Sequence, residues 1–247
     1  MGLNLVALTL LLNLPPIREP LLQIGQVFIK LCYHRIIIMQ AIDFLFSIAV
    51  LVMSVVLHEI SHGYVANALG DKTAKQAGRL TLNPLAHLDP FGSVILPVFL
   101  FLSARLFGGG IIFGWAKPVP YNPHNLKNQK FGPALVAAAG PLSNFFIALL
   151  FSLFIRFAVP ANLFPTEIFS IIGFIISINL ILMLFNLIPI PPLDGSKILL
   201  AFFPDKWRQK TLLFERFGLI IVLVFLFSFF PVILKIASGL FLLLTGF

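Results

Sequence analysis

The sequence has little charge and almost no cysteine. Only 11% of its 247 residues are charged, whereas soluble domains carry about 25% charged residues. This composition excludes an ordinary soluble globular protein. The one cysteine, Cys32, excludes an intrachain disulfide framework and any zinc site built from several cysteines. Five histidines and nine acidic residues are the remaining supply of metal ligands and acid–base groups.

Apolar residues dominate instead. They make up 59% of the chain and give it a mean hydropathy of +1.03, which is typical of a polytopic membrane domain. A helix needs about 20 apolar residues to cross a bilayer. The segments that meet this requirement are 41–69, 133–159, 166–190 and 213–246, the last of which could divide near Pro231. A fifth apolar run, Phe91–Phe107, is short and carries a proline and an arginine.

The fold prediction is an all-α polytopic membrane protein with about five or six transmembrane helices. A short membrane-embedded non-helical or β segment is expected near 108–121, where glycines and prolines argue against a helix and apolar residues suit a strand or re-entrant segment. Residues 39–247 are interpreted as one membrane-embedded domain with its core at 41–200. Residues 1–38 are interpreted as an N-terminal extension without an assigned role.

Lysine and arginine predict the orientation. Seven lie within 70–130 and five within 191–216, but none within 160–165. Short loops rich in these residues stay on the cytoplasmic side. If 91–107 re-enters rather than crosses, both basic segments are cytoplasmic; a full crossing would remove most of the asymmetry. The net charge of +8 is therefore interpreted as topological, and no nucleic acid partner is expected.

The most informative polar cluster lies inside the first predicted span. Residues 58–62 read HEISH, and ionisable side chains within a membrane are rare and usually functional. The spacing puts His58 and His62 on one helical face, where both can bind one metal ion. Glu59 lies about 100° around the helix, beside the metal, where it can take a proton from a metal-activated water. These residues predict a hydrolytic zinc site in the membrane.

A catalytic zinc usually has three protein ligands plus water, so one ligand is missing from this cluster. Asp194 is the best candidate because it follows a proline-rich stretch at the end of a span. Irregular backbone at membrane depth must be buried in protein or line a cavity. His87 and Asp89 compete with it, but their proline-rich surroundings favour a turn or capping role.

Three motifs in this order resemble the site-2 protease family of intramembrane zinc metalloproteases. They are HEISH at 58–62, GPLSN at 140–144 and N-x-x-P-x-P-x-x-D-G at 186–195. The resemblance covers roughly residues 41–200. It is to the compact form of the family, which carries no appended PDZ or CBS domain.

This resemblance implies that His58, His62 and Asp194 bind one Zn²⁺ per chain and that Glu59 is the catalytic acid/base. It also implies that Asn144 lies near the active site. Considered by its residue type alone, Asn144 has two open roles. It could be catalytic, with its amide stabilising an oxyanion or holding substrate backbone, or it could form an interhelical hydrogen bond.

The predicted function is hydrolysis of peptide bonds in or near transmembrane segments of membrane proteins. The expected partners are transmembrane protein substrates and the lipid bilayer, and the non-helical stretch around 111–120 offers a strand edge for an extended substrate. The expected location is a bacterial or archaeal cell membrane, with the active site toward the cytoplasm. The oligomeric state is left open. The alternative function is a metal-ion transporter or channel, which gives no reason for Glu59 between the ligands.

Overall fold

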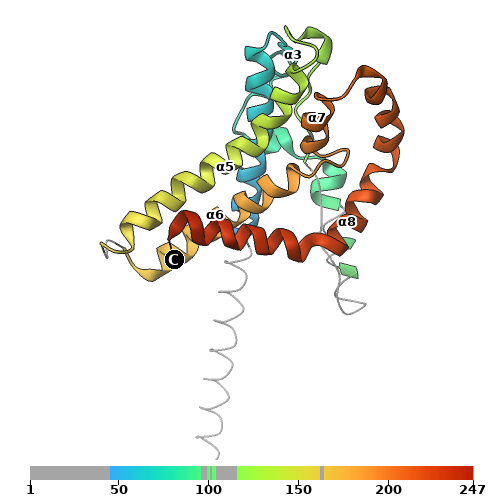
Figure 1. Ribbon diagram of the computed structural model, residues 1–247. Coiled ribbons are helices and arrows are strands. Elements are labelled where there is room, and N and C mark those ends of the chain that lie inside the picture. The colour runs from blue at the N-terminus through green and yellow to red at the C-terminus, as the bar shows by residue number, and fades with distance from the viewer. Residues whose placement is uncertain (1–44, 96–98, 101, 104–115, 162–163, 247) are drawn as a thin grey trace, which may run out of the picture. The chain divides into compact units, whose positions relative to one another are not determined.

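The structure, a computed structural model, describes residues 45–95, 99–100, 102–103, 116–161 and 164–246. The chain divides into two compact units, Met1–Ala49 and Val50–Phe247, and the contacts described below lie within the second. Figure 1 shows an arrangement of helices, and the described residues contain no strand. The helices are Leu45–Ala68 (here called the first span), α3 (Thr73–Gln76), α5 (Gly132–Ala158), α6 (Thr166–Asn186), α7 (Asp194–Leu200) and α8 (Asp205–Thr245), with short turns η1 (Pro84–His87), η2 (Pro90–Ile95) and η3 (Pro123–Asn125).

Four of these helices are long and apolar enough to cross a membrane: the first span, α5, α6 from Glu167 onward, and the Ser228–Thr245 part of α8. The prediction of an all-α polytopic membrane protein is confirmed. The count within the described residues is four rather than five or six. Residues 96–98, 101 and 104–107 of the fifth apolar run and the whole N-terminal extension lie outside those residues.

Two finer predictions concern the last span and the non-helical segment. The 213–246 segment does not divide, because α8 continues through Pro231. A proline is tolerated within a membrane helix when the freed backbone groups are satisfied locally, and Figure 1 shows α8 as one bent helix. Of the expected non-helical segment, residues 116–121 have neither helix nor strand, while 108–115 lie outside the described residues.

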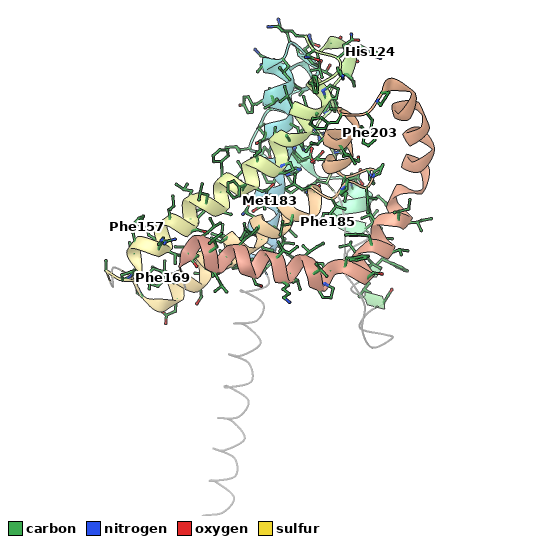
Figure 2. All side chains as sticks on the ribbon, in the orientation of Figure 1. His124, Phe157, Phe169, Met183, Phe185 and Phe203 are labelled. Carbon is green, nitrogen blue, oxygen red and sulfur yellow. The ribbon has the colours of Figure 1, made fainter. Side chains whose placement is uncertain are left out.

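Helices α5, α6 and α8 pack together. Small residues allow the close approach, since association in a membrane depends on packing rather than on a hydrophobic effect. The buried cluster consists of Ala148 and Ile155 on α5, Ile172, Ile176, Leu180 and Met183 on α6, and Ala237 on α8. Large apolar side chains point away from this core; Phe157 on α5, 72% exposed, is labelled in Figure 2. Such outward faces suit contact with lipid.

A buried carboxylate ties the end of the first span to residues 122–127. Gly70 has a positive φ, and Asp71 N–H donates to the Ala66 carbonyl at 2.9 Å, so the helix ends in a Schellman motif. The Asp71 side chain, fully buried, accepts hydrogen bonds from Thr73, from Asn122 N–H at 2.7 Å and from Asn125 Nδ2 at 2.9 Å. This cluster, here called the Asp71 clasp, holds two distant segments together.

Replacing Asp71 by Ala is expected to lower the free energy of unfolding by about 1–3 kcal/mol, because buried donors lose a charged acceptor. Burial raises the pKa of this carboxyl, but the hydrogen bonds outweigh it and bring the pKa below its usual 3.8. The stabilisation is therefore complete above pH 3.8 and is lost as the pH falls through the lower, folded-state pKa. Thermal unfolding in detergent at several pH values measures both effects. The exposed neighbour Lys72→Ala is the control and should leave the midpoint unchanged.

Candidate metal centre and active site

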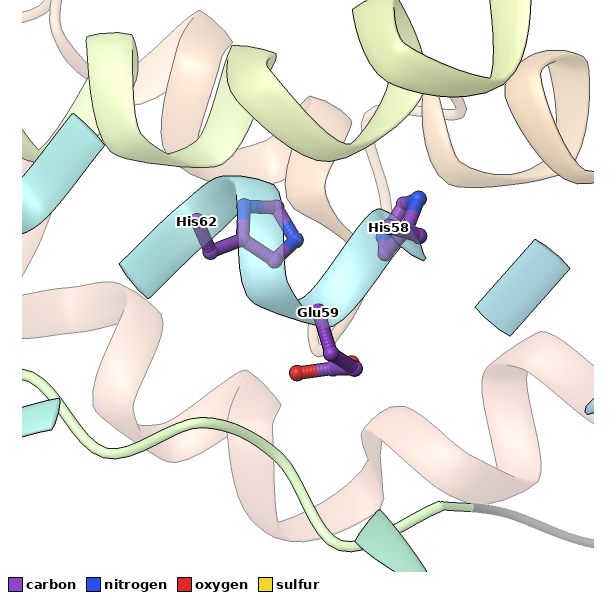
Figure 3. A group of neighbouring side chains, drawn as sticks. All are labelled: His58, Glu59 and His62. Atoms are coloured by element: carbon purple, nitrogen blue, oxygen red, sulfur yellow. The ribbon is translucent and has the colours of Figure 1, made fainter. Parts of the chain in front are cut away.

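The first span presents two histidines one turn apart. The ring centroids of His58 and His62 lie 4.7 Å from each other with the rings edge to face, and both residues come from the middle of a continuous helix. Figure 3 shows the two rings and the Glu59 side chain on adjacent turns, with Glu59 pointing to a different side. The i, i+4 spacing thus places two nitrogen donors on one face, as the sequence predicted.

Asp194 reaches the same point from the first residue of α7. Its Oδ2 lies 3.1 Å from His58 Nε2 and 3.2 Å from His62 Nε2. Tight backbone packing fixes this position, because a Cβ on Gly195 would overlap the Leu187 carbonyl oxygen. Glycine therefore lets α7 start directly against the end of α6.

The distances from the Asp194 oxygen to the two imidazole nitrogens are close to those of a zinc site. Zinc ligands lie about 2.0–2.2 Å from the metal, so two ligands at a tetrahedral angle lie about 3.3–3.6 Å apart. The Asp194 oxygen is at nearly this distance from both imidazole nitrogens. The other carboxylate oxygen, Oδ1, faces Lys197 Nζ at 3.6 Å. The donor set of two imidazole nitrogens and one carboxylate oxygen therefore fits Zn²⁺.

Each imidazole is held in place by a hydrogen bond at its Nδ1 atom. His62 Nδ1 lies 2.6 Å from the Val136 carbonyl oxygen, and His58 Nδ1 lies 2.6 Å from Asn144 Oδ1. Hydrogen bonds of this kind fix the orientation of ligating histidines and direct Nε2 toward the metal. Gly140 provides the space, because a Cβ there would lie 2.5 Å from ring atoms of both histidines. Two residues of the GPLSN motif, Gly140 and Asn144, thus lie directly against the rings.

Asn144 lies at this site, but both ends of its side chain are hydrogen bonded. Its Oδ1 contacts His58, and its Nδ2 donates to Asn179 Oδ1 at 2.8 Å. The bond to Asn179 uses one of the two N–H groups on Nδ2, and an oxyanion donor would use the other. The observed contacts include an interhelical hydrogen bond, and the oxyanion role stays a prediction.

Glu59 is oriented by backbone. Its Oε2 accepts a hydrogen bond from Val119 N–H at 2.9 Å, the one N–H between two prolines, Pro118 and Pro120. A ligand atom of Glu59 lies within 4.8 Å of those of His58 and His62. The carboxylate is therefore beside the two imidazoles and held at a fixed angle.

The residues around Val119 are themselves clamped. Buried Arg79 donates from Nη2 to the carbonyls of Lys117 at 2.8 Å and Pro118 at 3.3 Å. Lys117 N–H donates to the His87 carbonyl at 2.9 Å. These bonds occupy the polar backbone groups that residues 117 and 118 would offer an added strand. Residues 111–115 of the expected strand edge lie outside the described residues.

The two competing ligands lie in local structure instead. His87 Nε2 lies 2.9 Å from the Thr81 carbonyl oxygen, and Asp89 accepts from Gly92 N–H at 2.7 Å. Both contacts match the turn and capping roles that their surroundings favoured. Sequence reasoning missed Arg79, Asn179 and the Val119 amide; the one visible signal was a polar Asn179 within an apolar span.

Comparison with known proteins agrees with this geometry. The model of peptidase family M50 matches residues 46–231. "Putative zinc metalloprotease YwhC" of Bacillus subtilis (strain 168) is 39% identical over 72% of this chain and 78% of its own length. "Putative zinc metalloprotease Rip2" of Mycolicibacterium smegmatis is 31% identical over 75% of this chain and 68% of its own.

No solved structure matches the chain. The family match covers all three motifs, from HEISH to the aspartate that follows the prolines. The chain therefore belongs to peptidase family M50, the site-2 protease family of zinc metalloproteases that its motifs indicated.

Proposed function

We propose that this chain is an intramembrane zinc metalloendopeptidase that cleaves membrane proteins in or near their transmembrane segments. His58, His62 and Asp194 hold one Zn²⁺, and Glu59 is the general base and then the general acid. The observation that carries the proposal is the convergence of His58 Nε2 and His62 Nε2 on one Asp194 oxygen, at 3.1 and 3.2 Å.

The depth of the site supports cleavage within the membrane. His58 lies 13 residues after the first residue of a 24-residue span and 10 before its last, so about 15 Å of helix separates it from the nearer end. The hydrocarbon core is about 30 Å thick. Residues 39–247 are proposed to act as one membrane-embedded domain, with residues 1–38 as an extension of it.

The chemistry follows from the positions of the side chains. When bound, zinc would polarise the scissile carbonyl and lower the pKa of a water. Glu59 takes one proton from that water as the water oxygen attacks the carbonyl carbon of the scissile peptide bond. Glu59 then delivers the proton to the leaving nitrogen as the C–N bond breaks. The Val119 N–H donates to Oε2 of Glu59. This bond can hold the carboxylate in place while its other oxygen takes and delivers the proton.

The substrate proposal follows from the fold. A transmembrane helix hides its carbonyls in backbone hydrogen bonds, so a substrate must unwind locally before it can be cleaved. The basic segments 70–130 and 191–216 support a cytoplasmic position for the mouth of the site. The bacterial relatives support a bacterial cell membrane as the location.

The proposal is tested by metal content and cleavage together. Purified wild type is expected to hold about one zinc per chain and to cleave a reconstituted single-span reporter protein. His58→Ala and Asp194→Ala should each lose both properties, since two remaining ligands bind zinc weakly. Mass spectrometry of the metal and gel analysis of the reporter are the measurements. Zinc transport into vesicles without cleavage of any reporter would favour a transporter and contradict the proposal.

A further inference from the structure

Four buried polar side chains form one hydrogen-bonded chain that ends at His58 and links three membrane helices. Ser54 and His58 are on the first span, Asn144 is on α5 and Asn179 is on α6, and none is more than 6% exposed. Asn144 Nδ2 donates to Asn179 Oδ1 at 2.8 Å, and Asn179 Nδ2 donates to Ser54 Oγ at 3.0 Å. Unpartnered amides at this depth would be costly. We refer to this chain of contacts as the asparagine relay.

The relay has only one self-consistent direction. Asn179 Nδ2 lies 2.9 Å from the Ile175 carbonyl oxygen, which can only accept, so this end of the amide must be the NH₂ group. Its Oδ1 therefore faces Asn144, which must donate from Nδ2. Asn144 Oδ1 then faces His58, whose Nδ1 must carry a hydrogen. A flipped asparagine has almost the same shape, so hydrogen-bond partners alone decide its orientation.

We propose that Asn179 is a positioning residue of the metal centre. By orienting the Asn144 amide, it fixes His58 as the tautomer with hydrogen on Nδ1, which leaves the Nε2 lone pair free for the metal. This inference rests on the proposed zinc site. His62 needs no such relay, because its Nδ1 faces the Val136 carbonyl directly. One imidazole is thus fixed by backbone and the other by side chains.

The contacts indicate which members of the relay matter most for the orientation of His58. Without Asn179, the Asn144 amide can turn and present Nδ2 to His58, which favours hydrogen on Nε2 and blocks metal binding there. Ser54 is less important, since the Ile175 carbonyl orients Asn179 without it. Ser177, two residues away on α6, donates to the Gly173 carbonyl of its own helix at 2.8 Å. It is the matched control.

The experiment compares Asn179→Leu, Ser54→Ala and Ser177→Ala in the full chain. Zinc affinity is measured by chelator competition. Histidine tautomers are measured by long-range ¹H–¹⁵N spectra of the metal-free protein in micelles, with Asp194→Ala added to every sample, because the Asp194 oxygen 3.1 Å from His58 Nε2 would otherwise favour hydrogen on that atom. We expect Asn179→Leu to weaken zinc binding by about tenfold, in the range seen when partners of metal ligands are removed. It should also add an Nε2–H population at His58 while His62 stays unchanged. Ser177→Ala should match wild type, and Ser54→Ala should lie close to it.

Asn179→Ser, which is smaller and polar, repeats the test should the leucine variant fail to fold. A shifted His58 tautomer in the Asn179 variant supports the relay. If wild type also holds no zinc, the proposed protease function fails while the relay stands. An unchanged His58 tautomer in a folded Asn179 variant would overturn the relay, whatever happens to stability. Unchanged zinc affinity alongside a shifted tautomer would overturn the link between Asn179 and the metal.

Discussion

Glu59→Gln is expected to reduce peptide hydrolysis by about 10³-fold or more while zinc stays bound. A positioned general acid–base group contributes about 10²–10⁴-fold, and Glu59 is assigned both proton transfers here. Glutamine has almost the same shape and can still accept the Val119 N–H through its amide oxygen, so the side chain should keep its place. What it loses is the carboxylate that takes the proton. Reporter cleavage rate and zinc content, measured on one preparation, separate chemistry from metal binding.

Glu167→Gln makes the same chemical change at an exposed position in the first turn of α6 and should retain full activity. More than a tenth of wild-type activity in the Glu59 variant would remove Glu59 from the acid–base role. Loss of zinc from that variant would mean that Glu59 is itself a ligand, a possibility raised by its position within 4.8 Å of both imidazole nitrogens. The two failures are therefore distinguishable.

The sequence predicts this centre where the chemistry depends on local spacing. His58 and His62 needed only a helix through residues 58–62, and an apolar segment of that length makes a helix nearly obligatory in a membrane. Asp194 lies 136 residues from His58 along the chain, yet its place after an irregular proline-rich stretch marked it. The roles of these residues stay predictions until metal binding and cleavage are measured.

Long-range polar contacts without a repeating pattern could not be predicted in this way. The clamp of Arg79 on residues 117 and 118 joins a loop to a non-helical segment, and the sequence around Arg79 shows only a basic residue near the membrane surface. The Val119 contact uses a backbone N–H, which every residue but proline carries. The sequence also left open whether Pro231 divides the last span, and α8 continues through it.

Gly140→Ala, which adds one methyl group, is expected to weaken zinc binding by more than about 100-fold, beyond the usual effect of changing a ligand's partner. A Cβ at this position would lie 2.5 Å from Cε1 and Nε2 of His58 and from Cε1 of His62. The rings cannot simply turn away, since each is tethered through Nδ1, one to Asn144 and one to the Val136 carbonyl. Either the rings leave the metal position or α5 moves back and takes both tethers with it.

The same substitution elsewhere isolates this effect from helix propensity. Glycine in a helix interior is less stable than alanine by about 0.5–1 kcal/mol, so Gly140→Ala should make α5 itself more stable while the metal site fails. Gly239→Ala has nothing within 4 Å of the new Cβ, and at Gly173 the nearest atom is 3.6 Å away on Phe241. Both control variants should keep wild-type zinc affinity, measured by chelator competition. Wild-type affinity in Gly140→Ala would mean that the two imidazoles have space to retreat without losing the metal, and that Gly140 does not set their position.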